Sequence, residues 1–295
     1  MKKRWKIFWI VCAVLACTGI LLVTAGAALG GLTMLRSSKD ERFIESVLDR
    51  LGIGIRTEVT YTSDSGFLPD LSEDGSYVPG EPDGELITAW EGVGELNLDL
   101  GGLGVIAIPY EGSEILVDLS GLRSDLRSGV DITQNGGELE VTAENRNWNT
   151  NDGSMIYISI PRGTYFDSVS ANVGAGFLEL SGISAGEISM NVGAGQIIAE
   201  DMTAEDVEAY CSAGQITMSG EVMGDADIEC SLGEVLFTTS GTQDMYNYEL
   251  TCGMGELVVG NETYSGLSNA LSLDNGSDRT ITADCAMGRI EVLYE

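Results

Sequence analysis

A short element of the form small residue–any residue–glycine recurs along the second half of the 295-residue chain, and it constrains the fold more than any other feature. The copies end at Gly176, Gly195, Gly214, Gly233, Gly255 and Gly288, which gives steps of 19, 19, 19, 22 and 33 residues. A unit of this length is too short to bury an apolar face alone, whereas stacked units can share one core. The repeat therefore predicts a stack of similar units.

Apolar residues occupy fixed alternate places around each of these glycines. Three places before the glycine, the residues are Val173, Val192, Cys211, Cys230, Cys252 and Cys285. Two places after it, they are Leu178, Ile197, Ile216, Val235, Leu257 and Ile290. The residues between these places are mostly polar, as Asn172, Asp227 and Asp284 illustrate. A period of two is typical of a strand that buries one face.

The predicted fold is all-β: a single-stranded parallel β-helix (solenoid) over residues 85–295. Its repeats are clearest from residue 169, and weaker copies precede them at residues 96–108, 130–141 and 155–161. The rungs should lie about 4.8 Å apart, which is the normal spacing of paired strands. A β-sandwich is the alternative, because short alternating strands with frequent turns also suit that fold.

The repeat also predicts details of the solenoid. The corner glycines should adopt a backbone conformation that other residues reach only with strain. The residue before each corner glycine, such as Leu103 or Met254, should point inward. The extra residues of the last two steps, 242–247 and 264–279, should protrude. The final strand, Arg289–Tyr294, should leave the terminal edge of the stack without a cap.

The amino terminus has the pattern of a membrane anchor. Residues 1–6 form a basic tip, and residues 7–35 form an uncharged, mostly apolar run that exceeds the roughly 20 residues a transmembrane helix needs. The basic tip favours a cytoplasmic amino terminus in the plasma membrane, with the bulk of the chain extracytoplasmic. Two alternatives remain open: a signal peptide cleaved near Ala25–Ala27, or a lipid attached to Cys17.

Two segments are expected to connect the anchor to the repeats. Residues 36–56 should form a juxtamembrane amphipathic helix with one apolar stripe, and residues 57–84 read as an acidic linker. Within the linker, Asp70–Glu81 resembles a calcium loop, with oxygen ligands at places 1, 3, 5 and 12 and Gly75 at place 6. Pro79 and Gly80 disturb that pattern, and such matches arise easily in an acidic chain, so no metal site is assigned.

Composition excludes several function classes. The chain holds 15 Lys+Arg and 46 Asp+Glu, for a net charge of −31, and this charge argues against binding nucleic acid. It contains no histidine, which excludes Ser-His-Asp and Cys-His catalysis and histidine-ligated metals. The arginines beyond the membrane-proximal region are scattered and form no catalytic pattern: Arg123, Arg127, Arg146, Arg162, Arg279 and Arg289. We therefore expect no enzyme, no cofactor, and no catalytic, cofactor-binding or metal-binding residues.

The cysteines are expected to be structural. Cys12 and Cys17 fall inside the apolar run, and the other four continue the column of Val173 and Val192. A small buried apolar residue is the simplest role for that column, so free buried thiols are predicted. Disulfides between neighbouring rungs are the alternative.

The basic start with its single anchor, the strand end Ile158–Pro161 and the repeated Val/Ile-x-x-x-Gly-x-Gly-x-Ile pattern resemble a known family. It is the bacterial putative-adhesin family of β-strand-repeat domains of unknown function, akin to head-GIN and autotransporter-type adhesins. The resemblance covers residues 85–295 and implies a membrane-anchored extracellular module that binds a protein or glycan without catalysis. A self-assembling envelope scaffold, joined end to end, is the alternative, and a polysaccharide-active enzyme is a third.

Overall fold

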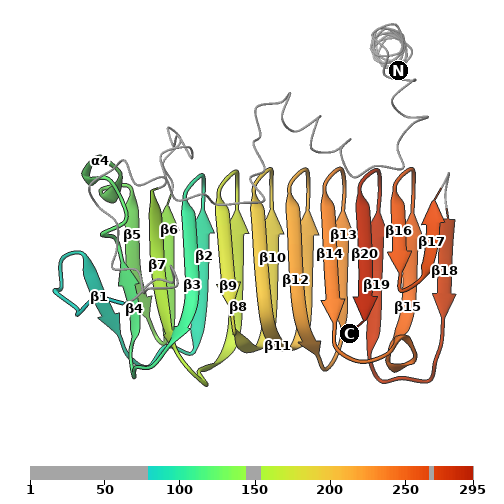
Figure 1. Ribbon diagram of the computed structural model, residues 1–295, viewed down its shortest axis with the longest axis horizontal. Coiled ribbons are helices and arrows are strands. Elements are labelled where there is room, and N and C mark those ends of the chain that lie inside the picture. Colours follow the sequence, from blue (N-terminus) through green and yellow to red (C-terminus); the bar gives the residue numbers. More distant parts are fainter. Residues whose placement is uncertain (1–78, 144–153, 266–268, 295) are drawn as a thin grey trace, which may run out of the picture. The chain divides into compact units, whose positions relative to one another are not determined.

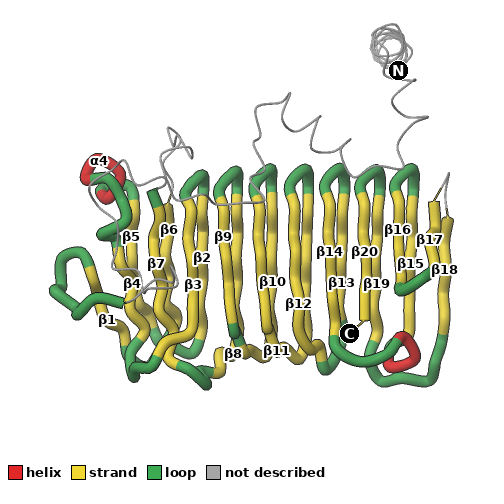
Figure 2. Tube along the Cα trace, viewed as in Figure 1, coloured by secondary structure: helices red, strands yellow, loops and turns green. Residues whose placement is uncertain are grey.

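Strands dominate the computed structural model, which describes residues 79–143, 154–265 and 269–294 (Figures 1 and 2). The expected basic tip, apolar run, juxtamembrane helix and most of the linker lie outside these residues. No helix within the described ranges is long and apolar enough to cross a membrane. The short helices are α4 (Ser124–Arg127) and the 3₁₀ turn η2 (Gln243–Met245).

The 20 described strands form one sheet, which is continuous through β11 (Gln196–Cys211) and has two sides that face each other across a common core. We call these two sides the first sheet and the second sheet. In spatial order, the first sheet contains β5 (Val130–Asn135), β6 (Glu138–Ala143), β2 (Glu95–Leu100), β8 (Tyr165–Val173), β10 (Ser184–Val192), the second half of β11, β13 (Ala226–Cys230), β19 (Thr280–Cys285), β15 (Asn247–Cys252) and β18 (Asn269–Leu273).

The second sheet contains the strands that follow each corner, together with its end strands. In spatial order, these are β1 (Ile87–Trp90), β4 (Ile115–Asp118), β7 (Met155–Pro161), β3 (Gly104–Tyr110), β9 (Phe177–Ser181), the first half of β11, β12 (Gln215–Val222), β14 (Glu234–Thr239), β20 (Arg289–Tyr294), β16 (Glu256–Val259) and β17 (Glu262–Ser265).

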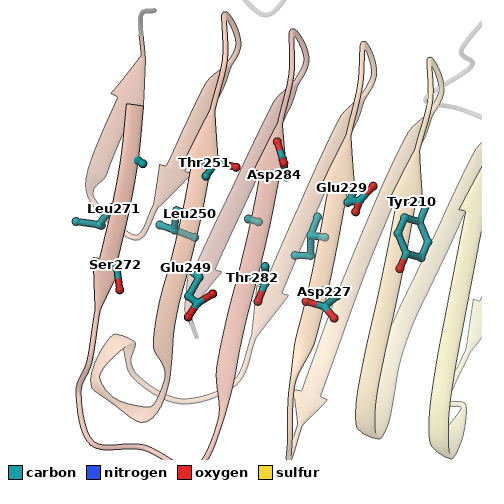
Figure 3. A pocket seen from close by; sticks show the side chains of 13 residues that line it. Tyr210, Asp227, Glu229, Glu249, Leu250, Thr251, Leu271, Ser272, Thr282 and Asp284 are labelled. Atoms are coloured by element: carbon teal, nitrogen blue, oxygen red, sulfur yellow. The ribbon is translucent and has the colours of Figure 1, made fainter. Parts of the chain in front are cut away.

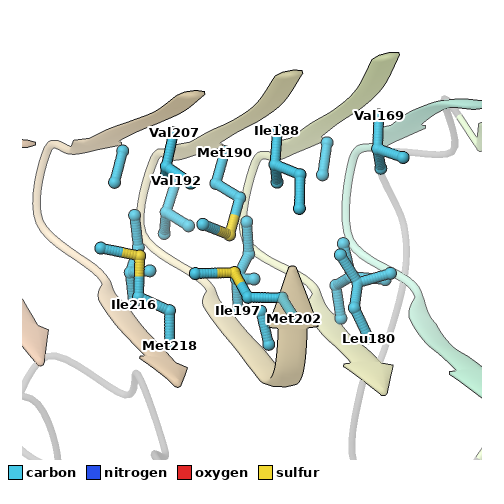
Figure 4. Close-up of a cluster of buried hydrophobic side chains, with 14 of the residues drawn as sticks. Val169, Leu180, Ile188, Met190, Val192, Ile197, Met202, Val207, Ile216 and Met218 are labelled. Atoms are coloured by element: carbon cyan, nitrogen blue, oxygen red, sulfur yellow. The ribbon is translucent and has the colours of Figure 1, made fainter. Parts of the chain in front are cut away.

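Neighbouring rungs pair in parallel, with like residues in register. Val192 of β10 pairs with Val173 of β8 on one side and with Cys211 of β11 on the other, each 19 residues away. The all-β solenoid predicted from the repeat is therefore confirmed, and the β-sandwich alternative does not form. The alternating apolar residues point inward, where Val192, Ile197 and Met218 belong to the continuous core (Figure 4).

The corners correct two expectations. The corner glycines have no positive φ; they are needed because rungs approach closely, and a Cβ on Gly195 would lie 2.3 Å from the Gly176 carbonyl oxygen. The middle residue of the corner points outward, with Leu232, Met287 and Met254 exposed by 57%, 51% and 62%. It lies at the apex of the turn, so its Cβ faces solvent.

The first corner is shifted by one residue from the predicted alignment. Leu103 is buried, and it lies beside Gly176, which is the third residue of the neighbouring corner. The predicted alignment had placed Leu103 beside the middle residue of that corner. A Cβ on Gly176 would lie 2.2 Å from the Leu103 carbonyl oxygen. The corner of this copy is therefore residues 101–103.

The rungs do not stack in chain order. The first rung, β2 with β3, lies between β6–β7 and β8–β9, and the last rung, β19 with β20, lies between β13–β14 and β15–β16. The expectation that Arg289–Tyr294 forms an uncapped terminal edge is therefore wrong. Antiparallel strands close the stack: β1 and β5 at one end, and β17 and β18 at the other.

The extra residues of the last two repeat steps do more than protrude. Residues 264–279 supply the end of β17 and all of β18, which pair antiparallel with β16 and β15. Residues 242–247 contain the turn η2, and the buried Tyr246 that follows it donates a hydrogen bond to the Val222 carbonyl oxygen at 3.1 Å. Residues 264–279 therefore extend the stack at its end, whereas residues 242–247 place Tyr246 in the core.

Candidate functional site

The outer face of the first sheet carries a cluster of acidic side chains near its β18 end. The strands place them outward because the alternate residues Ile228, Ala283 and Leu250 face the core. We call the following outward residues the acidic patch: Tyr210, Asp227, Glu229, Glu249, Thr251, Ser272, Thr282 and Asp284. They line a shallow hollow of about 710 Å³ across β11, β13, β19, β15 and β18 (Figure 3).

Strand register arranges the acidic patch in two rows. One row runs Asp227, Thr282, Glu249, Ser272 across β13, β19, β15 and β18. The other runs Tyr210, Glu229, Asp284, Thr251 across β11, β13, β19 and β15. Neighbours within a row are about 4.8 Å apart at the backbone. The insertion of β19 between β13 and β15 brings Asp284 beside Glu229, although 55 residues separate them (284 − 229).

Every charged side chain of the acidic patch is negative. No lysine follows Lys39 in the sequence, and the described arginines lie elsewhere: Arg123 and Arg127 at α4, Arg162 after β7, Arg279 before β19, and Arg289 on the second sheet. Among the described residues, no ion pair involves a carboxylate of the patch. Burial of the Tyr210 phenol raises its pKa, and the charges of Glu208 and Glu229 raise it further. The patch therefore attracts cations.

The acidic patch has chemistry suited to binding. It offers carboxylates and hydroxyls that accept hydrogen bonds, and the ring of Tyr210 supplies an aromatic surface that also favours cations. All of these groups but Ser272 stand on strands that are hydrogen-bonded to neighbours on both sides, so most of the array is rigid. Such an array has the chemistry to hold positively charged groups.

The structure locates the residues that the sequence singled out. Cys211, Cys230, Cys252 and Cys285 are free, buried and in one column, as predicted. Of the calcium-like segment, residues 70–78 lie outside the described ranges, as does Arg146, while Glu81 is exposed. Within the part of the chain that the structure describes, no cluster of three or more His, Cys, Asp or Glu side chains could hold a metal ion.

Sequence reasoning missed the acidic patch. Its residues do occupy the polar places of the repeat columns, so their outward direction was predictable. Their juxtaposition was not, because it depends on the order in which the rungs stack.

Parallel rungs over a shared core, closed at both ends by antiparallel strands, make this an all-β solenoid protein. Residues 96–283 match the family model described as Toastrack DUF4097, and the chain belongs to that family. The resemblance to an adhesin-like β-repeat family is thus confirmed. No curated protein matches the sequence.

Solved structures with a similar chain include three bacterial proteins. A putative cell adhesion protein from Clostridium sporogenes is 15% identical with a TM-score of 0.40, covering 71% of this chain and 98% of its own. A putative adhesin from Bacteroides fragilis is 10% identical with a TM-score of 0.32, covering 72% and 100%. A putative adhesin from Parabacteroides distasonis is 13% identical with a TM-score of 0.34, covering 70% and 95%.

Proposed function

We propose that this chain is a non-enzymatic surface module that holds an extended cationic partner against the acidic patch. The observation that carries the proposal is a rigid face on which Asp227, Glu229, Glu249 and Asp284 stand together with no arginine or lysine. Such a face raises the local concentration of positive groups and speeds encounter with them. The partner is a basic protein segment or an amine-bearing glycan.

The membrane anchor gives this module its setting. The basic tip and the apolar run of residues 7–35 support attachment to the plasma membrane with the solenoid outside the cytoplasm.

Self-association is the weaker alternative. The final strand β20 is paired on both sides, so the uncapped edge that motivated an end-to-end scaffold does not exist. Association would have to use the short end strands β1, β5, β17 or β18. Sedimentation of the detergent-solubilised chain over a range of concentrations tests this alternative, which requires the mass to rise with concentration.

Binding of a fluorescent oligolysine tests the proposed function directly. The full chain carrying Asp227→Asn, Glu229→Gln, Glu249→Gln and Asp284→Asn should lose at least tenfold in affinity at low salt. A matched control carries Glu85→Gln, Glu91→Gln, Glu221→Gln and Asp278→Asn, four exposed carboxylates outside the patch. Both variants change the net charge equally, so the control should keep most of its affinity. Equal losses in the two variants would show that only overall charge matters and would contradict the proposal.

A further inference from the structure

The end strand β18 leaves one side of the first sheet open. It pairs antiparallel with β15, from Leu273 opposite Tyr248 to Asn269 opposite Cys252, and with no other strand among the described residues. An antiparallel strand directs its backbone N–H and C=O groups alternately to its two sides. The groups on the side away from β15 are therefore available to another strand, and we call this side the open edge.

The sequence of β18 lacks the features that usually protect such an edge. Proteins discourage pairing at an edge with charged side chains, proline or a bulge. Strand β18, from Asn269 to Leu273, has no charged residue and no proline, and its register with β15 is unbroken. The end strands β5 and β17 carry Asp131 and Glu262. Strand β1 is uncharged, but it lies on the second sheet at the opposite end of the stack.

The core side of β18 carries apolar side chains that the solenoid covers only in part. Leu271 and Leu273 lie opposite the buried Leu250 and Tyr248 of β15, so they face the same side. Leu271 is nevertheless only partly buried, and Leu273 is 38% exposed. A strand added at the open edge would cover both leucines if every second residue of that strand were apolar.

The outer side of β18 continues the acidic patch. Ser272 ends the row that runs through Glu249, and Ala270 lines the same hollow (Figure 3). A residue of an added strand opposite Ser272 would lie roughly 10 Å from Glu249 at the backbone, which is two strand spacings. Extended lysine and glutamate side chains together span that distance. The exposed Asp274, directly after β18, adds a carboxylate here. The outward residues of an added strand should therefore be basic.

We propose that β18 accepts an additional strand from a partner protein, in an extended segment that alternates apolar residues with lysine or arginine. This inference rests on the proposed function and narrows its partner to a protein segment that can pair as a strand. The backbone of the segment pairs with the open edge, and its apolar side chains cover Leu271 and Leu273. Its basic side chains lie beside the acidic patch. Backbone pairing supplies affinity in this mode of binding, and the alternate side chains supply specificity.

Two peptides of identical composition test strand addition on the full chain at low salt. One fluorescent decapeptide alternates lysine and valine, and in the other all lysines precede all valines. Both carry the charge that the proposed function requires, but only the first has the period of a strand. The alternating peptide should bind about tenfold more tightly. It should also slow amide hydrogen exchange in β18 about tenfold, whereas the block peptide should leave that exchange unchanged.

The outcomes separate this inference from the proposed function. Equal binding of both peptides, without new protection in β18, would overturn strand addition and leave the acidic patch as a binding surface. Binding of neither peptide would contradict both proposals. Protection of β18 in the free chain that falls on dilution would mean that a second copy occupies the open edge, which would also overturn the proposal.

Two variants of β18 provide matched controls, because Leu273→Asp and Ser272→Asp add the same charge on opposite sides of the strand. Leu273→Asp should weaken binding of the alternating peptide about tenfold, since a carboxylate replaces the apolar contact. Ser272→Asp should bind it at least as tightly, since the new carboxylate faces the lysines. Unchanged exchange in β8 and β10 checks that both variants are folded. Tighter binding by both variants would show that charge alone matters and would overturn the proposal.

Discussion

At the scale of single residues, the corners depend on the absence of one methyl group. A Cβ added to Gly214 would lie 2.3 Å from the carbonyl oxygen of Gly195 and 2.3 Å from a methyl group of Val192. The neighbouring middle place imposes no such limit, since Leu232 and Met254 fill it in other rungs and point into solvent. Two adjacent positions of one corner thus differ sharply in the size of side chain that they tolerate.

The substitution Gly214→Ala should therefore lower the free energy of unfolding by about 1–3 kcal/mol, because neighbouring rungs must move apart to admit the methyl group. Ala213→Leu, one residue earlier, should change it by less than about 0.5 kcal/mol, since the side chain extends into water. Urea denaturation of both variants measures the difference. If the two variants were equally stable, close approach would not be the reason for the corner glycine.

At the scale of elements, a ladder of polar side chains ties the strands of the second sheet together. Gln196 donates to Gln215 at 3.0 Å, and Gln215 donates to Glu234 at 3.2 Å. Arg289 of β20 then pairs with Glu234 of β14 at 3.1 Å and with Glu256 of β16 at 3.3 Å. The inserted strand β20 is thus bound on both sides by charge as well as by its backbone.

Replacing Arg289 with alanine should cost about 1–2 kcal/mol, because Glu234, Glu256 and Glu291 would be left as neighbouring like charges. Arg162→Ala is the control: its ion pair with Glu111 is exposed, so its loss should cost less than about 0.5 kcal/mol. Thermal unfolding at low and high salt measures both effects. The Arg289→Ala loss should shrink as salt screens the repulsion, and a loss that does not depend on salt would contradict this explanation.

The sequence predicted the strands but not the order in which they stack, and the aligned columns of the repeat show why. Alternation around Gly195 and Gly214 identifies strands, corners and the inward face, because burial selects apolar residues at every second place. The neighbour of Cys230 is ambiguous, however, since Cys252 and Cys285 present the same chemistry in the same column. In the structure β13 pairs with β19, so the neighbour of Cys230 is Cys285. The acidic patch could not be predicted for the same reason, because Asp284 lies beside Glu229 only when β19 pairs with β13.

At the scale of the whole solenoid, both chain-terminal rungs are internal to the stack. Each strand of the last rung has a parallel partner on either side: β13 and β15 for β19, β14 and β16 for β20. In a solenoid stacked in chain order, removing the last rung would expose one interface. Here its removal separates β13–β14 from β15–β16 and exposes two.

A chain that ends after Asp278 should therefore lose more than one rung. Amide hydrogen exchange should show lost protection in β13 to β16, while β8 and β10, which keep both neighbours, remain protected. The full chain is the reference. Retained protection across β15 and β16 would mean that these strands can pair directly with β13 and β14, and that the inserted rung is dispensable.

The position of β2 also decides how the solenoid would respond to tension. A pull transmitted through residues 79–94 reaches β1 first, an end strand with a single hydrogen-bonded partner that can peel away one bond at a time. The pull then reaches β2, which is held between β6 and β8 by two parallel ladders that must slide together before it can leave. Under a pull from this side, the solenoid would therefore yield a little at β1 and then resist at β2.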